Sequence, residues 1–257
     1  MEPKKEILAE GVEIWLGDCL KTPDISHVNH VITDPPYSEL VHSTRGRRGA
    51  SIRKDGGPKL EIIDFESVTA KQGDIAAFVG SICAGWFLTF SDIYALNGWR
   101  DAVLLAGGKS KSVALWIKPD CAPQFNGQKP ATAFECIGVF WFGKGFSNWN
   151  GGGSRGLYTH NTNGSRRDGI HPTEKPVPLM NDLIRLFTKP GDKVLDPFMG
   201  SGTTGVACVN LGRKFIGVEI EEKYYNIARR RISDALKQPR LPFEPQPKME
   251  QQCLMLA

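Results

Sequence analysis

The sequence predicts an α/β fold of the doubly wound type, built on a mostly parallel seven-stranded sheet with an antiparallel edge hairpin. Short apolar runs rich in β-forming residues alternate with helical stretches, which is the pattern of such a sheet. The length of 257 residues suits one large domain. Apolar residues make up 40% and charged residues 23% of the chain, as in globular proteins that bury a sizeable core.

Seven short runs of mainly β-branched, aromatic and aliphatic residues are the predicted strands. No helical stretch separates residues 112–117 from residues 136–142, and we therefore expect these two to pair as the edge hairpin. The predicted strands, in order, are residues 12–16, 30–33, 86–90, 112–117, 136–142, 193–196 and 214–218.

Three helices are predicted in the C-terminal part of the chain. Residues 178–188 begin with a proline, which favours the first helical turn, and carry leucines at helical spacing. Residues 203–211 begin with two threonines and end before a glycine, and residues 222–236 have one apolar face. We expect a single domain over residues 1–236, followed by a loosely ordered Pro- and Gln-rich tail over 237–257.

Composition argues against several classes of protein. The N-terminal segment MEPKKEILAE lacks the apolar core of a signal peptide, and no apolar run approaches the ~20 residues of a membrane span. We therefore expect a cytoplasmic protein without membrane contact. The six cysteines form no CxxC pair, so no metal site is predicted. A net charge of +4 permits a nucleic-acid partner without requiring one.

Residues 194–205 are predicted to form a strand, a glycine turn and the start of a helix. Gly200, Gly202 and Gly205 fit the pattern G-x-G-x-x-G, and Glu219 follows at the end of the next predicted strand. Glycines at these positions let the backbone approach a nucleoside, and an acid at the second strand end hydrogen-bonds a ribose diol. The segment is therefore a candidate nucleoside-binding loop.

A nicotinamide dinucleotide is the first rival ligand for this loop. Two features count against it. A dinucleotide-binding fold usually continues with several strands after this loop, but only one further predicted strand follows here. In addition, Asp196 lies just before the turn, where its charge would repel a pyrophosphate and favour a cationic ligand. The segment 107–110 (GGKS) is not a phosphate-binding P-loop, because Val103 occupies the position of the first glycine.

The predicted strand 30–33 ends at the tetrapeptide Asp34-Pro35-Pro36-Tyr37. The prolines stiffen the backbone, and in isolation a strand end with a rigid turn explains the tetrapeptide as well as a functional role does. The functional interpretation is chemical. The Asp34 carboxylate and the Pro35 carbonyl could accept both hydrogens of an aromatic amino group and expose its lone pair, while Tyr37 stacks on the ring. An extruded nucleic-acid base would suit such a site.

This tetrapeptide, the segment 171–176 (HPTEKP) and the segment 196–204 (DPFMGSGTT) together resemble the β class of amino-group DNA methyltransferases, which act on adenine N6 or cytosine N4. In that class the catalytic motif precedes the cofactor loop, as it does here. The resemblance covers roughly residues 12–236. It implies a Rossmann-like methyltransferase fold with permuted motif order, S-adenosylmethionine as the cofactor and double-stranded DNA as the partner.

The resemblance assigns roles to the matching residues. Glu219 holds the cofactor ribose, the segment 171–176 flanks the methionine end, and Asp18 lies near the adenine, although a surface acid at a strand end explains Asp18 equally well. The implied catalytic residues are Asp34, Pro35, Pro36 and Tyr37. The implied cofactor-binding residues are Asp18, His171, Thr173, Lys175, Pro176, Asp196, Phe198, Gly200, Ser201, Gly202, Thr203 and Glu219.

The chain departs from the family in lacking a long, separate target-recognition domain. Two long loops, at about 42–70 and 143–170, would have to recognise the target, because their basic residues could contact phosphates or guanine edges. For any single arginine, a solvated surface charge is the default interpretation, and the run 229–231 (RRR) is expected on the exposed face of the last helix. The candidate DNA-binding residues are Arg45, Arg47, Arg48, Arg53, Lys54, Arg155, Arg166 and Arg167.

Several alternatives stay open on the sequence. Asp rather than Ser at position 34 favours adenine N6 over cytosine N4 as the target. An RNA or protein-amide methyltransferase is a further alternative, because basic loops cannot distinguish DNA from RNA. A nicotinamide-binding or non-enzymatic domain would leave the segments 34–37 and 171–176 unexplained. Relatives in this class are often dimers, so a homodimer is one open oligomeric state. Any restriction enzyme that acted with this protein would be a separate chain.

Overall fold

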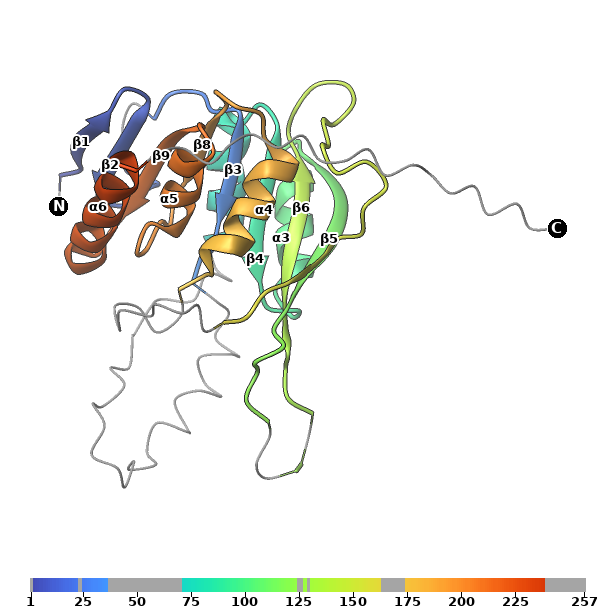
Figure 1. Cartoon of the computed structure of the whole chain (residues 1–257). Coiled ribbons are helices and arrows are strands. Elements are labelled where there is room, and N and C mark those ends of the chain that lie inside the picture. The colour runs from blue at the N-terminus through green and yellow to red at the C-terminus, as the bar shows by residue number, and fades with distance from the viewer. Residues whose placement is uncertain are drawn as a thin grey trace, which may run out of the picture.

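The computed structural model describes residues 2–22, 25–36, 71–123, 127–128, 130–162 and 174–238. Their strands form one nine-stranded sheet in the order β1-β2-β9-β8-β3-β4-β6-β5-β7 (Figure 1). The strands are β1 (Lys4–Ala9), β2 (Val12–Leu16), β3 (His30–Thr33), β4 (Trp86–Ser91), β5 (Lys109–Ile117), β6 (Phe134–Trp141), β7 (Leu157–Thr159), β8 (Lys193–Asp196) and β9 (Lys214–Glu219).

Helices cover both faces of the sheet. The described helices are α2 (Gln72–Ile82), α3 (Leu96–Leu105), α4 (Val177–Phe187), α5 (Thr203–Asn210) and α6 (Glu222–Leu236). In Figure 1, α4, α5 and α6 lie in front of the sheet and α3 lies behind it. One apolar core contains Leu179, Ala207 and Ala228 from the front helices, and the other contains Ile75 and Trp99 from α2 and α3. This arrangement is the predicted doubly wound fold. No helix in these residue ranges is long and apolar enough to cross a membrane.

The strand directions define two opposite edges of the sheet. Neighbours in the series β2, β9, β8, β3 and β4 are parallel, so their carboxyl ends meet at one edge, here called the carboxyl edge. The opposite one is the amino edge. Strand β6 is antiparallel to both β4 and β5, which confirms the predicted hairpin. In Figure 1 the carboxyl edge lies at the bottom, where the hairpin projects.

The seven predicted strands all form, and they occupy adjacent positions from β2 to β5. The sheet nevertheless has nine strands, because β1 pairs with β2 and β7 pairs with β5 at its two margins. Neither was predicted. Strand β1 is largely exposed and half charged, and β7 has only three residues, so neither shows the buried run of a core strand. Helices α2 and α3 were also missed; each contains glycine, which weakens a helical pattern.

Candidate active site

Five neighbouring parallel strands deliver carboxylates to the carboxyl edge. Each of β2, β9, β8, β3 and β4 ends at an acidic residue or within two residues of one. Open α/β sheets bind ligands at this edge, and the accumulated negative charge favours a cationic ligand. The acids, in sheet order, are Asp18, Glu219, Asp196, Asp34 and Asp92.

The two central acids, Asp34 and Asp196, lie at the ends of paired strands. Strand β3 is parallel to β8, and Thr33 Oγ1 donates a hydrogen bond to Asp196 Oδ1 at 2.7 Å. Asp34 follows Thr33 directly, and Pro35 and Pro36 continue the chain outward from it. The start of the predicted catalytic tetrapeptide therefore adjoins the start of the predicted cofactor loop.

Asp196 is a buried carboxylate surrounded by donors. Thr204 Oγ1 donates to its Oδ2 at 2.6 Å, and the Phe198 amide donates to its Oδ1 at 3.1 Å. Burial nevertheless outweighs these bonds and, with a contribution from the charge of Asp34, raises the pKa of Asp196 to about 6. A cation bound beside Asp196 would favour its charged form, which is the electrostatic behaviour expected of a site for a positively charged ligand.

Lys175 joins Asp34 to a second carboxylate. Its Nζ lies 2.5 Å from Asp34 Oδ2 and 3.2 Å from Glu135 Oε2, and its side chain is only 7% exposed. Burial acts to lower the pKa of Lys175, but the two carboxylates outweigh burial and raise it. The Nζ also lies 4.9 Å from the centre of the Phe90 ring. The sequence placed Lys175 with the cofactor-binding residues, whereas its closest contacts in the structure are with the candidate catalytic carboxylate.

The edge hairpin extends this network by one more charge. Glu135 also forms an ion pair with Lys118, whose Nζ lies 4.5 Å from the centre of the Trp116 ring. The result is an alternating chain of charges, Asp34–Lys175–Glu135–Lys118, here called the charge chain. On sequence alone, residues 116–119 and 134–137 resemble the edge hairpin of the amino-group methyltransferases, and plain packing explains most of these residues. The opposite charges of Lys118, just after β5, and Glu135, at the start of β6, were a sequence signal for an ion pair across the hairpin. Only the tertiary fold brings Lys175 to this pair.

The glycine loop is held against Glu219. The Gly200 amide donates to Glu219 Oε2 and the Glu221 amide to Oε1, both at 2.8 Å. Burial outweighs these bonds and raises the pKa of Glu219 to about 7. Gly200 has φ of +51°, and no described atom lies within 4 Å of the position that a Cβ would take there. A ligand can therefore approach the backbone closely at Gly200.

Gly202 has a different, structural reason to be glycine. Its φ is +84°, and a Cβ would lie 2.8 Å from the Cβ of Ala228 in α6. We expect Gly202→Ala to reduce the free energy of unfolding by about 2–4 kcal/mol, combining a left-handed conformation with overpacking. Gly107→Ala is the matched control, because Gly107 has the same φ of +84° with open space around it. Urea denaturation should show a loss of only about 1 kcal/mol there. Equal losses in the two variants would contradict the contact with α6.

Arg231 contacts both the glycine loop and Glu174, the residue before Lys175. Its Nη1 donates to the Ser201 carbonyl at 2.7 Å and to Ser201 Oγ at 2.8 Å, and its Nη2 forms an ion pair with Glu174. Glu174 also accepts a hydrogen bond from Thr203 Oγ1 at 3.2 Å. We expected the basic run of α6 to lie on the exposed face of the helix. This expectation is wrong for Arg231, because its side chain packs against the glycine loop at Ser201.

The other predicted cofactor-binding residues lie at the same edge or outside the described residues. Pro176 precedes the first turn of α4, and Phe198 is half-buried. Asp18 accepts from the Leu20 amide at 3.0 Å, so it stabilises its own turn, next to the strand that carries Glu219. The predicted residues that lie outside the described residues are Tyr37, Arg45, Arg47, Arg48, Arg53, Lys54, Arg166, Arg167, His171 and Thr173.

Arg155 is not brought together with Asp34. Strand β6 ends at the amino edge, and the loop after it begins there, with the Asn150 amide bonded to the C-terminal end of α4. The chain then returns beside the middle of β5, where Gly156 lies against Ala114. It reaches the end of β5 only at His160. The first half of the predicted recognition loop, up to Arg155, therefore lies away from the carboxyl edge, because β6 runs against its neighbours.

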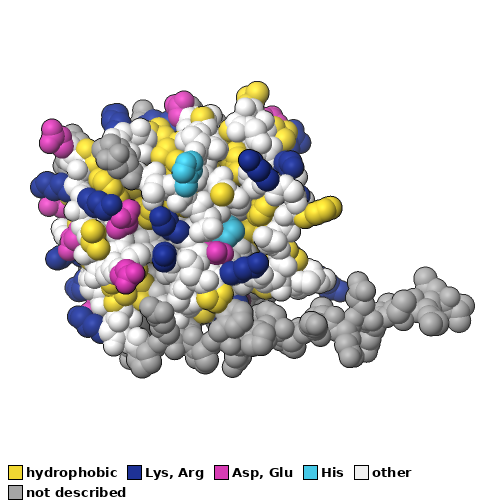
Figure 2. Space-filling model, turned by 90° about the horizontal axis from the view of Figure 1, so that it is seen from above, with side chains coloured by type: hydrophobic (Ala, Val, Ile, Leu, Met, Phe, Trp, Pro, Cys, Tyr) yellow, Lys and Arg dark blue, Asp and Glu magenta, His cyan; other side chains and the backbone are white. Residues whose placement is uncertain are grey.

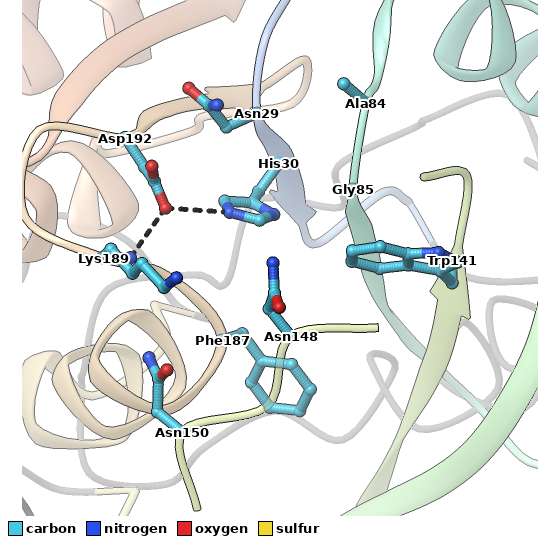
Figure 3. Close-up of a pocket in the computed structure, with 10 residues that line it drawn as sticks. All are labelled: Asn29, His30, Ala84, Gly85, Trp141, Asn148, Asn150, Phe187, Lys189 and Asp192. Atoms are coloured by element: carbon cyan, nitrogen blue, oxygen red, sulfur yellow. Dashed lines mark hydrogen bonds and ion pairs between the residues drawn. The ribbon is translucent and has the colours of Figure 1, made fainter. Parts of the chain in front are cut away.

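A cavity of about 170 Å³ opens at the amino edge (Figure 3). His30 Nε2 lies 3.1 Å from Asp192 Oδ2 at its rim, and the Trp141 and Phe187 rings form part of its wall. No predicted site residue lines it, so it is separate from the candidate active site. Figure 2 views this end of the molecule, where Lys and Arg side chains are interspersed with Asp and Glu. A polyanion would meet mixed charge there.

The chain matches known proteins over most of its length. The family model N6_N4_Mtase, described as DNA methylase, matches residues 28–230. The chain is 27% identical over 228 residues to the Putative methylase YubD of Escherichia coli (strain K12), covering 84% of this chain and 88% of that protein. It is 55% identical to the Type II methyltransferase M2.DpnII of Streptococcus pneumoniae over 64 residues, which span 25% of this chain and 24% of that protein.

Solved structures share the fold. The crystal structure of an M1.HpyAVI-SAM complex is similar with a TM-score of 0.66 and 24% identity, covering 86% of this chain and 98% of that one. The cytosine-N4-specific PvuII DNA methyltransferase is similar with a TM-score of 0.64 and 17% identity, covering 87% and 90%. Both similarities extend across nearly the whole described domain.

Proposed function

The chain belongs to the DNA methylase family, and on that premise we propose that it transfers a methyl group from S-adenosylmethionine to the exocyclic N6 of a flipped-out adenine in double-stranded DNA. One observation carries the proposal. Asp34, paired with Lys175, stands directly beside Asp196 and the glycine loop through the Thr33–Asp196 hydrogen bond. A site that activates an amino group thus adjoins a site suited to a cationic nucleoside.

The residues of the chain would act on the target base by positioning it. The adenine amino group donates its two hydrogens to the Asp34 carboxylate and the Pro35 carbonyl, which draws the nitrogen toward tetrahedral geometry and exposes its lone pair. S-adenosylmethionine would supply a methyl group on a positively charged sulfur. Direct attack by the amino nitrogen would form the N–C bond as the C–S bond breaks, leaving the neutral thioether, and the methylated nitrogen would lose one proton to water. Lys175 keeps the Asp34 carboxylate oriented throughout. No covalent enzyme intermediate is needed.

The cofactor pocket is assigned from the residues that fit its parts. Glu219 would accept hydrogen bonds from the ribose hydroxyls, and the open space at Gly200 admits the nucleoside to the backbone. Ile220, 56% exposed directly after Glu219, offers an apolar surface for the adenine ring. The buried charge of Asp196 would favour the cationic methionine end of the molecule.

The pKa of Glu219 predicts pH-dependent cofactor binding. Its pKa of about 7 in the unliganded protein means that the acid form predominates at lower pH, whereas ribose hydroxyls bind the ionised form better. Binding below pH 7 therefore releases a proton, and the contribution of Glu219 should raise the affinity for S-adenosylmethionine with increasing pH, by at most about tenfold per pH unit, until it levels off above about pH 7. Calorimetry from about pH 5 to about pH 8 measures this slope.

Glu219→Gln is the control for this titration, because glutamine keeps the shape and cannot ionise. The variant should bind more weakly and lose the rise near pH 7, while retaining the lower-pH contribution of Asp196, whose pKa is about 6. Parallel pH profiles for the wild type and the variant would refute the assignment of Glu219 to the ribose.

Target recognition is assigned to the segments that leave the fold at the carboxyl edge. The basic segment 42–70 follows the catalytic tetrapeptide, and the part of the second loop beyond His160 leads to Glu174. The first segment lies wholly outside the described residues, and the second lies outside them beyond Thr162. Because Arg155 lies beside the middle of β5, it is the weakest member of the predicted DNA-binding set.

Sequencing of methylated DNA from cells that express the protein tests the proposal. Nucleoside analysis of the same DNA should find N6-methyladenine at one recognition sequence. N4-methylcytosine instead would replace the adenine assignment with the cytosine-N4 specificity of the PvuII methyltransferase. Methyl transfer to structured RNA or to protein, without transfer to duplex DNA, would overturn the choice of substrate.

A further inference from the structure

Two large side chains stand exposed on the carboxyl edge beside the candidate catalytic strand. Ile93 is 56% exposed and Tyr94 is 72% exposed. They follow the end of β4, the parallel neighbour of β3, with Thr33 opposite Thr89. Asp34 and the Ile93-Tyr94 pair therefore leave the sheet side by side at the same edge. A large aromatic ring left in solvent beside a candidate active site calls for a binding partner.

The turn that carries this pair is fixed from both sides. Asp92 Oδ1 accepts hydrogen bonds from the Tyr94 amide at 2.9 Å and from the Ala95 amide at 3.0 Å. Gln72, at the start of α2 and only 4% exposed, donates through Nε2 to the Ala95 carbonyl at 3.1 Å. The exposed pair therefore stands on a braced turn, which lowers the entropy lost when a ligand packs on it.

The same contacts place the pair between Pro36 and Lys71, the described residues that flank the basic segment in the sequence. The described chain leaves the sheet at Pro36 and returns at Lys71, immediately before Gln72. Residues 42–60 between them carry Arg45, Arg47, Arg48, Arg53, Lys54 and Lys59 against one acid, Asp55. The apolar pair thus has the catalytic strand end on one side and the start of α2, next to Lys71, on the other.

We propose that Tyr94, supported by Ile93, is a stacking platform for a DNA base next to the flipped-out target. The inference rests on the proposed function and deepens it. Extruding a base removes the stacking of its neighbours, and aromatic or apolar side chains compensate by packing on the exposed base faces. Stacking needs no charge, which suits a turn whose Asp92 carboxylate is engaged with backbone amides.

A matched set of variants isolates the platform. Tyr94→Ala removes the ring, Tyr94→Phe keeps it, and Phe146→Ala removes a 98% exposed aromatic from the loop that begins at the amino edge. The probe is a duplex with the recognition sequence found by sequencing and 2-aminopurine at the target adenine. Anisotropy gives the Kd for DNA, 2-aminopurine fluorescence reports extrusion of the base, and calorimetry gives the Kd for S-adenosylmethionine.

We expect Tyr94→Ala to weaken DNA binding about five- to a hundredfold, the effect of losing one base–aromatic stack, and to reduce the extruded fraction. Tyr94→Phe should stay within about twofold of wild type, because the ring remains. Phe146→Ala should match wild type, and every variant should bind S-adenosylmethionine normally.

Three results would overturn the platform. Wild-type DNA affinity and base extrusion in Tyr94→Ala would refute it while the proposed function stands. Loss of cofactor binding in Tyr94→Ala would mean that the Tyr94 ring stabilises the fold rather than stacking on DNA. A change in oligomeric state with unchanged DNA affinity per site would assign it to a second copy of the chain. A wild-type protein that transfers no methyl group to DNA refutes the proposed function, and the platform with it.

Discussion

Replacing Asp34 with alanine is expected to reduce kcat for DNA methylation by at least about a hundred- to a thousandfold, the range found when one preorganised polar group is removed from a reaction centre. The carboxylate is the acceptor that would draw an amino hydrogen away from the ring plane. Among the described residues, the neighbouring Pro35 offers only its carbonyl and cannot replace the carboxylate. Single-turnover methyl transfer measures the effect directly.

The same variant should retain its fold and its cofactor site. Lys175 keeps Glu135 as a partner at 3.2 Å, so removal of Asp34 does not leave a buried cation alone. Asp196 keeps its bonds to Thr33 and Thr204. The Kd for S-adenosylmethionine should therefore change only a few-fold, by a small electrostatic amount. Asp34→Asn is the isosteric control; it keeps an acceptor oxygen and should lose less than alanine does. Normal turnover in Asp34→Ala would remove the catalytic assignment.

The central sheet could be predicted from sequence because its information is local. Strands β3 and β8 are buried at nearly every position, each has a central pair of aliphatic residues, and their bounds match the prediction. The parts that were missed have weak local signals. Strand β1 has an exposed charged pattern, and Gly73 and Gly80 interrupt the pattern of α2. Such elements form because they pair with or pack on a sheet whose own strands have strong local signals.

The candidate site likewise contains residues that the local sequence identifies and contacts that only the tertiary fold creates. Motif spacing was enough to select Asp34, Asp196 and Glu219 as candidates, since each ends or directly follows a predicted strand and parallel strands share an edge. The contacts of Arg231 could not be found this way. It lies 30 residues from Ser201 and 57 from Glu174, and only the packing of α6 on α5 determines where its side chain goes.

The position of the second loop depended on strand direction rather than on composition. Residues 143–170 are rich in Gly and Asn and contain several arginines, which suggested one continuous recognition loop. The antiparallel setting of β6 puts the first part of that loop at the amino edge, and β7 carries the chain back along β5. Loop length alone does not reveal at which edge a loop begins.

Replacing Lys175 with methionine should reduce both catalysis and stability. The change leaves the Asp34 and Glu135 carboxylates facing each other without the cation that both contact at present. Breaking a buried ion pair in this way typically costs about 3–5 kcal/mol. We expect a value below that range, because 28% of the Asp34 side chain is exposed and Lys118 still neutralises Glu135. Thermal or urea unfolding of the variant provides the measurement.

The catalytic defect of Lys175→Met should have a signature that general destabilisation lacks. Two carboxylates that have lost a shared cation resist ionising together, so the pKa of the pair should rise. A protonated Asp34 accepts amino hydrogens poorly, and the residual rate of the variant should therefore increase with pH, above the range in which the wild type has levelled off. Adding Glu135→Gln removes the repulsion and should lower the pH at which the rate levels off. A flat pH profile in Lys175→Met, or a double variant that titrates like the single one, would mean that the charge chain supports the fold without controlling the acceptor at position 34.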